Sequence, residues 1–229
     1  MRRNVGLAFA GVAAVCAIVL AVHNVPLTPT PADAAALRKL IPEAHARPSD
    51  FQQQIALILN VQDRVLSAAP EQDGIPLDQP RELGDLLRAR HGACFDRSRA
   101  IETALRAYGF ETRHAAIYST AETKSALRSL ATRDNLSHAI TEVRTERGWM
   151  IVHSNTRWAG LTADGKPADL AAVRAAPRQK WSPLVRSPLP DIYRRPFTWV
   201  YGLYSRHGRF YAPYDPIPDV NWGELAQNL

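Results

Sequence analysis

Apolar residues recur at helical spacing through much of the first half of the chain. The longest of these sets predicts an amphipathic helix from Phe51 to about Ser67, with Ser49 or Asp50 as its N-cap. A shorter helix is predicted over 34–41, where the following proline ends it.

Two more helices are predicted on either side of a His91-Gly92 turn. Residues 81–90 carry inward-facing leucines up to this turn. After it, apolar residues at helical spacing continue until Gly109 stops the run. The pattern predicts a helix of about 14 residues, with Cys94 in its first turn.

The pattern then changes to the two-residue alternation of strands. Strands are predicted over 112–119, 137–145 and 149–154, with a hairpin turn over 146–148 between the last two. Residues 125–132 fit a short helical turn in an insertion. Helices followed by an antiparallel sheet predict an α+β domain.

Cys94 is one of two cysteines, and the other, Cys16, lies in an apolar N-terminal run. If the rest of the chain is exported, Cys94 is a single thiol without an obvious partner. Free backbone N–H groups and the helix dipole at a first helical turn stabilise a thiolate, which is the competent nucleophile. The alternative is a small buried hydrophobic residue, and the local pattern does not decide between the two.

Composition narrows the class of protein. The 229 residues, 46% of them hydrophobic and 22% charged, fit one globular domain with an extension. The net charge of +6 suits an acidic surface such as anionic lipid or polymer. The arginines of the chain are spread along its length without a dense run, which argues against nucleic-acid binding.

The N-terminus carries a candidate membrane segment. Arg2 and Arg3 precede an uncharged run of 18 residues, 5–22, which is just long enough to span a bilayer. Small residues at 32–34 resemble a cleavage site, but they lie well beyond the apolar run. We expect an uncleaved inner-membrane anchor with an extracytoplasmic, periplasmic domain. The alternative is a cleaved signal and a secreted periplasmic protein.

This organisation divides the chain into four parts. They are a membrane anchor or signal segment (1–24), a Pro-rich spacer (25–34), the main domain (35–176) and a Pro- and aromatic-rich extension (177–229). In the extension, 197–204 and 209–211 suggest a hairpin. Its aromatic rings are expected to pack on the main domain, and binding of sugar rings is the alternative.

A cysteine nucleophile needs a base, and His138 is the best placed of the seven histidines. It begins the strand that follows the cysteine helix, where a sheet can press it against the N-terminus of that helix. His91 is close in sequence but lies across a glycine turn, and His114 has no distinguishing feature. We expect no cofactor and no metal, because the histidines are dispersed and lack ligand spacing.

Four segments together resemble the core of the transglutaminase-like superfamily over residues 81–161. They are Gly92-Ala93-Cys94, Leu105-Arg106-Ala107-Tyr108-Gly109, Ser137-His138-Ala139 and Gly148-Trp149. The resemblance implies a papain-like α+β fold with a Cys–His–Asp triad, in a family of transglutaminases, cysteine peptidases, amidases and inactive relatives. It implies that Cys94 is the nucleophile and His138 the base.

The third triad position departs from the family pattern. The usual aspartate, four residues after the tryptophan, is His153 here, and no carboxylate occurs nearby. We expect His153 in this position, with Asn155 as the alternative third member, because an amide can orient a histidine. Neither residue adds an anionic charge beside His138. The alternatives are therefore a weaker activation of Cys94 or a loss of catalytic activity.

The leading hypothesis is an envelope-facing cysteine hydrolase or acyltransferase that acts on an amide or ester. Its partners would be a protein, peptide or cell-wall polymer substrate, and the membrane through the N-terminal helix, with no nucleic acid. The second hypothesis is an inactive transglutaminase-like binding or scaffold module. The third is a glycan binder that uses the aromatic extension.

Overall fold

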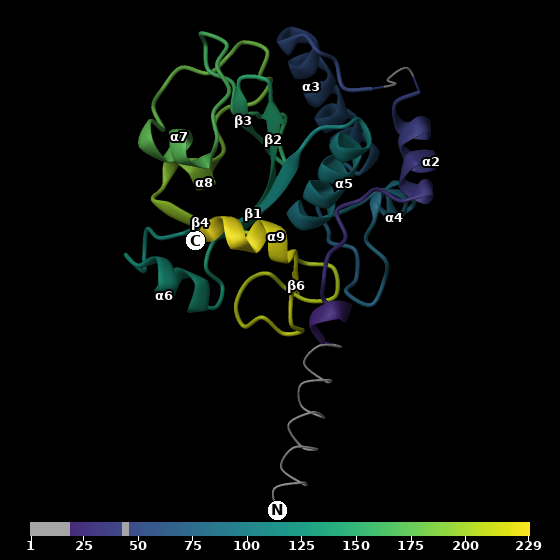
Figure 1. Ribbon diagram of the computed structural model, residues 1–229. Helices are drawn as coiled ribbons and strands as arrows, with labels where there is room; N and C mark the ends of the chain where they lie inside the picture. The colour runs from purple at the N-terminus through teal and green to yellow at the C-terminus, as the bar shows by residue number, and fades with distance from the viewer. Residues whose placement is uncertain (1–18, 43–45) are drawn as a thin grey trace, which may run out of the picture.

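The computed structural model describes residues 19–42 and 46–229. Its centre is a four-stranded antiparallel sheet in the order β3-β2-β1-β4 (Figure 1). The strands are β1 (Thr112–Ser119), β2 (Ser137–Thr145), β3 (Gly148–Val152) and β4 (Phe197–Tyr201). The mixed α+β class and the antiparallel sheet are as predicted.

Helices cover both sides of this sheet. α2 to α5 lie on one side and α7 and α8 on the other (Figure 1). The helices are α2 (Pro31–Leu40), α3 (Phe51–Ala68), α4 (Leu83–Ala89), α5 (Cys94–Ala107), α6 (Ala126–Ala131), α7 (Leu170–Ala175), α8 (Asp191–Arg194), α9 (Trp222–Leu225) and the 3₁₀ turn η1 (Ala226–Asn228). A separate two-stranded sheet joins β5 (Leu203–Tyr204) to β6 (Asp219–Val220).

The cysteine helix α5 begins where the sequence predicts it. Ala93 is the N-cap, and the Asp96 carboxylate accepts its backbone N–H at 2.9 Å, which satisfies one free amide at the helix start. Gly92 fits a crowded corner just before it, because an added Cβ would lie 2.5 Å from Leu86 Cδ1. Leu86 is a core residue, so α4 and the start of α5 are packed tightly together.

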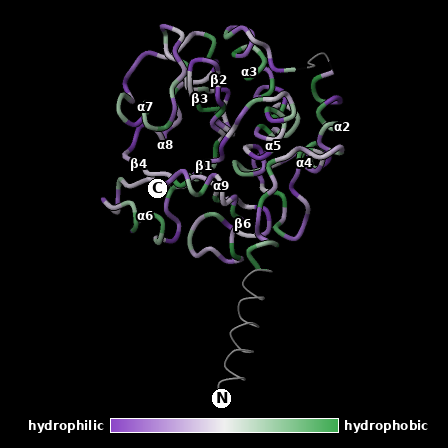
Figure 2. Tube along the Cα trace, viewed as in Figure 1, coloured by the Kyte–Doolittle hydropathy of each residue, from purple (hydrophilic) through white to green (hydrophobic). Residues whose placement is uncertain are grey.

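The two faces of the sheet bury separate apolar clusters. Residues of α3 to α5 pack with Val143, Met150 and Val152 on one face. Ile140 and Ile151 point to the other face and pack with residues of α7 and α8. The colours along α3 in Figure 2 alternate between hydrophobic and hydrophilic, as expected of a helix with one buried side.

The C-terminal segment is integrated into the sheet. β4 pairs with β1, so residues beyond 177 complete the central sheet. β5 pairs with the distant β6 and not with residues 209–211, so the predicted hairpin is wrong. Local alternation predicted a strand near 197, but its partner is fixed by long-range packing.

The predicted N-terminal membrane segment falls largely on residues 1–18, which lie outside the described residues. Among residues 19–42 and 46–229, no helix is both long and apolar enough to cross a membrane. After residue 24 the chain runs toward α2, whose N-cap Thr30 accepts the backbone N–H of Asp33 at 3.1 Å.

Candidate active site

Cys94 is the first residue of α5 and is partly buried. It packs against an apolar cluster made of Ala116 and Tyr118 of β1, Ala139 of β2 and Phe210. Phe210 belongs to the C-terminal segment, so a part of the chain more than a hundred residues away contributes to this cluster. The helix start is therefore an apolar environment for Cys94.

This environment raises the pKa of the Cys94 thiol to about 11, because burial disfavours the charged thiolate. Hydrogen bonds from the backbone at Ala139, Phe95 and Cys94 itself favour the thiolate but are the smaller effect. The prediction of a lowered pKa at the helix N-terminus is therefore wrong. The free amides are present, but desolvation outweighs them.

His138, at the start of β2, is held by Ser154. His138 Nε2 lies 3.1 Å from Ser154 Oγ, and that hydroxyl donates its hydrogen to the Ala139 carbonyl at 2.6 Å. Because Ser154 has a single hydrogen, its oxygen accepts from His138, and Nε2 carries the ring proton. Nδ1 of His138 then bears the lone pair, and this nitrogen is the atom that can act as a base.

His153 lies beside His138, but it does not hydrogen-bond to that ring. The two rings stack with centroids 4.3 Å apart and an interplanar angle of 19°. Nδ1 of His153 accepts the backbone N–H groups of Asn155 at 3.2 Å and Thr156 at 3.1 Å. His153 thus occupies the expected region but supports His138 by ring contact, while the hydrogen bond comes from Ser154.

Burial keeps both rings neutral. It lowers the pKa of His138 to about 3 and the pKa of His153 well below its usual 6.5. The proximity of His138 lowers the pKa of His153 further. Near neutral pH the resting site therefore holds a neutral thiol and neutral imidazoles, and not a thiolate–imidazolium pair.

Asn155 is directed elsewhere. Its Oδ1 accepts a hydrogen bond from Arg97 Nη1 at 3.2 Å. Arg97 is one turn after Cys94, is 2% exposed, and also donates to the Ala69 and Glu71 carbonyls at 2.6 and 2.7 Å. Asn155 therefore belongs to a buried arginine network that ties the end of β3 to the cysteine helix.

The structure brings Cys94 and His138 onto adjoining elements, without a direct bond. No hydrogen bond joins the Cys94 sulfur to the His138 ring in the part of the chain that the structure describes. Ala139 contacts Cys94, and Thr141 Oγ1 donates to the Ser98 carbonyl of α5 at 2.9 Å. Ile140 points to the opposite face of the sheet, and the backbone of Ala139, next to His138, hydrogen-bonds to the Cys94 thiol.

The other two histidines considered as the base have hydrogen-bond partners elsewhere in the structure. His91 Nδ1 contacts the Asp73 carbonyl at 2.9 Å. His114 is fully buried, with Nδ1 3.2 Å from Ser98 Oγ. Within the described ranges, no metal-ligating cluster includes Cys94 or His138.

Ser154 is the residue that the sequence did not single out. The only feature of the sequence that points to Ser154 as a partner of His138 is its position next to His153, just after a strand that pairs with β2. Serine is common in such turns, so the residue type alone does not indicate a role.

A family model described as the transglutaminase-like superfamily matches residues 50–154. The match includes Cys94, His138 and His153, and the resemblance predicted from the sequence is confirmed. A search of curated proteins finds no match to the chain.

Several solved structures align with part of the chain. A protein from Cytophaga hutchinsonii provisionally described as a cysteine protease is 16% identical, with a TM-score of 0.37, over 56% of this chain and 40% of its own. Arylamine N-acetyltransferase from Salmonella typhimurium is 20% identical, with a TM-score of 0.35, over 55% and 45%. Red sea bream transglutaminase is 15% identical, with a TM-score of 0.33, over 63% and 28%. The chain thus spans less than half of each of these proteins, and TM-scores this low carry no functional inference.

Proposed function

We propose, from the match of residues 50–154 to the transglutaminase-like family model, that the chain is a cysteine hydrolase or acyltransferase acting on an amide or ester. Cys94 is the nucleophile and His138 the base. One observation carries the proposal: the thiol lies at the start of α5 against Ala139, the residue next to a histidine whose basic nitrogen is set by Ser154. Nucleophilic catalysis needs the thiol and the base within hydrogen-bond reach of each other, and adjoining elements allow the two side chains to reach that distance in the substrate complex.

The neutral resting state determines the order of proton transfer. Cys94 attacks the substrate carbonyl as a thiol, and its proton passes to Nδ1 of His138 as the carbon–sulfur bond forms. The imidazolium then gives this proton to the leaving amine or alcohol, which leaves an acyl-thioester on Cys94. Water, or an acceptor amine, releases the acyl group and restores the thiol.

Proton transfer to His138 requires the two side chains to approach each other. Catalytic hydrogen bonds are often long without substrate and tighten in the substrate complex. The backbone amides of Cys94 and Phe95 already face the sulfur, and they are suited to stabilise charge that develops on the carbonyl oxygen. Without a carboxylate behind His138, the imidazolium gains no anionic support, and we expect a slow enzyme.

The experiment is to trap the acyl-enzyme with p-nitrophenyl acetate. The chain is incubated with the ester and analysed by intact mass and peptide mapping, beside Cys94→Ala and His138→Gln. We expect one acetyl group on Cys94, absent in Cys94→Ala and formed at least about 100-fold more slowly in His138→Gln. Acetylation of Cys94 at the same rate in His138→Gln would exclude His138 as the base.

A second candidate function is an inactive binding or scaffold module. It is favoured by the raised pKa of Cys94 together with a His138 ring that forms its hydrogen bond with Ser154. In that case no acyl-enzyme forms, and binding to peptidoglycan or another envelope polymer is unchanged by Cys94→Ala.

A glycan-binding role would use a different surface. A cavity of about 680 Å³ is lined by Trp199, Tyr201 and Trp222 of the C-terminal segment. Aromatic rings of this kind can stack on sugars. A polymer pull-down that survives Cys94→Ala but fails in Trp199→Ala would support this role.

For location and partners we propose an inner-membrane protein with its domain in the periplasm. The basis is the uncharged run 5–22 after Arg2 and Arg3. The substrate would be a protein, a peptide or a cell-wall polymer. The mass of the mature protein tests this directly, because an anchored chain keeps residues 1–24 and a cleaved one loses them.

A further inference from the structure

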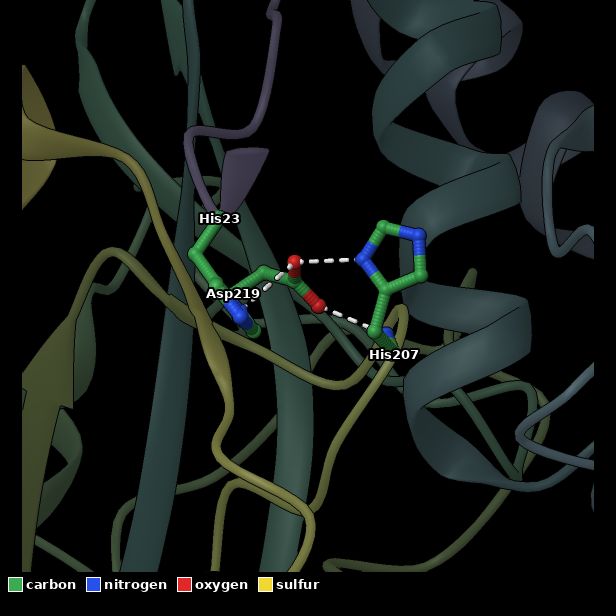
Figure 3. Close-up of side chains that lie close together, drawn as sticks. All are labelled: His23, His207 and Asp219. Atoms are coloured by element: carbon green, nitrogen blue, oxygen red, sulfur yellow. Dashed lines mark hydrogen bonds and ion pairs between the residues drawn. The ribbon is translucent and has the colours of Figure 1, made fainter. Parts of the chain in front are cut away.

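We propose that His23, His207 and Asp219 bind a divalent transition-metal ion, with zinc as the best match to their chemistry. The three side chains converge from distant parts of the sequence (Figure 3). Each offers one ligand atom, and these atoms all lie within 4.8 Å of one another. His23 precedes α2, whereas His207 follows β5 and Asp219 begins β6, so the spacing along the chain gave no sign of the cluster.

The carboxylate is oriented toward the two imidazoles. Asp219 Oδ1 lies 2.8 Å from His207 Nδ1 and 3.5 Å from His23 Nδ1. Its other oxygen, Oδ2, accepts the backbone N–H groups of Arg206 at 3.0 Å and His207 at 2.6 Å. Two amides thus fix the carboxylate and leave Oδ1 as the ligand atom, which is the supporting arrangement typical of metal ligands.

The separations are close to those that a zinc ion needs. Bonds of about 2.0–2.1 Å in a tetrahedral site place ligand atoms roughly 3.4 Å apart. The His23–Asp219 separation of 3.5 Å already has this value. The His207 ring, whose side chain is 53% exposed, has room to rotate by the small amount required.

His23 Nδ1 supplies an independent observation in favour of a ligand at this cluster. This atom is buried and has no hydrogen-bond partner. A buried nitrogen that could accept or donate is costly to leave unpaired. Coordination of a metal would satisfy it, and the 3.5 Å separation from Asp219 is too long for a good hydrogen bond.

The donor set limits which ions fit. Two imidazole nitrogens and one carboxylate oxygen suit zinc, copper or nickel better than the hard cations magnesium and calcium, which prefer oxygen ligands alone. The single carboxylate, together with the nearby positive charge of Arg81 that interacts with Asp219, also disfavours calcium. Three protein ligands leave a fourth position for water or another group.

The position suggests a structural clip. The backbone of His23 accepts from Val220 N at 2.8 Å, and Val25 N donates to the Val220 carbonyl at 3.0 Å. A metal would add a side-chain link between residues 23–25 and the 205–219 segment. That segment carries Phe210, a member of the apolar cluster against which Cys94 packs.

The test titrates Zn²⁺ and Co²⁺ into the full chain carrying Cys16→Ala and Cys94→Ala, so that no thiol can ligate. The protein is purified with a histidine-free tag in detergent, stripped with a chelator and followed by calorimetry, by Co²⁺ visible absorption and by thermal unfolding. We expect one Zn²⁺ per chain, a Co²⁺ spectrum with d–d bands, and a rise in Tm on adding Zn²⁺, since a ligand that binds only the folded state stabilises it.

The variants are His23→Ala, His207→Ala and, as the matched control, His91→Gln. We expect each ligand variant to weaken Zn²⁺ binding at least about tenfold and to remove the rise in Tm, and the control to bind as the parent does. Because His207 is half exposed, its variant is expected to fold, and circular dichroism without metal checks this. Absence of binding in the parent, or equal binding in His207→Ala, would leave a metal-free His–Asp ion pair and overturn the proposal.

Discussion

Ser154 Oγ accepts a hydrogen bond from His138 Nε2 at 3.1 Å while it donates to the Ala139 carbonyl at 2.6 Å. The pair fixes the tautomer of a buried histidine without using a charged residue. A carboxylate in this place would also stabilise the protonated ring, whereas a hydroxyl only orients it. The Ser154 hydroxyl thus fixes the orientation of His138 but adds no negative charge that would strengthen it as a base.

Replacing Ser154 by alanine tests this role. Ser154→Ala removes the acceptor of Nε2–H, so we expect the ring of His138 to populate both tautomers. Long-range ¹H–¹⁵N spectra of the parent should show a protonated Nε2 and an unprotonated Nδ1. Acetylation of Cys94 by p-nitrophenyl acetate should slow about tenfold or more.

Ser154→Thr is the control for this change, because it retains the hydroxyl and should keep the tautomer of the parent. A parent spectrum with the proton on Nδ1 would contradict the assignment. So would an unchanged spectrum in Ser154→Ala.

The pH dependence of Cys94 alkylation tests the buried thiol. With a pKa of about 11, the thiolate fraction rises about tenfold per pH unit throughout the range 7 to 10. We expect the rate of labelling by iodoacetamide at Cys94 to follow this slope without a plateau. Peptide mapping separates Cys94 from Cys16.

Phe210→Ala is the informative variant, because it opens the apolar cluster around the thiol. Solvation of the thiolate should lower the pKa of Cys94 and move the rate curve to lower pH. A parent curve that levels off below pH 7 would instead show a thiolate–imidazolium pair and contradict the neutral resting state.

The sequence predicted the local structure around the site well. The bounds of α5 and β2 agree with the predicted helix and strand, because apolar residues at helical spacing up to Gly109 and the two-residue alternation of a strand are local signals. It could not predict the pKa of Cys94, because the apolar cluster against which the thiol packs includes Phe210, which comes from a loop far along the chain.

The contacts of the third position were also beyond the sequence. Whether His153, Ser154 or Asn155 reaches His138 depends on how the chain turns after β3 ends at Val152. Simple alternation placed His153 and Asn155 on one side. In the folded chain, Ser154 alone of the three hydrogen-bonds to the His138 ring.

Asn155→Ala separates a structural role from a catalytic one. The variant removes the hydrogen bond to Arg97, and we expect a loss of about 1–2 kcal/mol in the free energy of unfolding, since the bond involves a charged group. Acetylation of Cys94 should change less than about threefold, well below the loss expected for an orienting residue.

Urea unfolding and the acetylation rate are measured on the same samples. Asn60→Ala serves as the control, since this half-buried asparagine lies on α3 and away from Arg97. A large loss of rate with unchanged stability would make Asn155 an orienting member of the site.

Glu224 makes stability depend on pH in a direction opposite to that of the buried histidines. Burial and the charge of Glu102 raise the pKa of Glu224 from 4.5 to about 8, although Tyr204 donates to it at 2.7 Å. Between these values the folded chain binds more protons than the unfolded chain, so stability falls as pH rises from 4.5 to 8. For His138, the pKa is about 3 in the folded chain and 6.5 in the unfolded chain. Its contribution to stability therefore rises as pH rises from about 3 to 6.5.

The difference between the parent and Glu224→Gln from pH 6.5 to 8 isolates Glu224, because the buried histidines His114, His138 and His153, which still titrate in the unfolded chain at pH 6.5, contribute equally to both. We expect the urea midpoint of the parent to fall relative to that of Glu224→Gln across this window. Glu111→Gln, at a side chain 56% exposed, should behave as the parent does. A parent midpoint that stays parallel to that of Glu224→Gln from pH 6.5 to 8 would show that Glu224 is ionised throughout. Arg106, 3.0 Å away, would then outweigh the burial of its carboxylate.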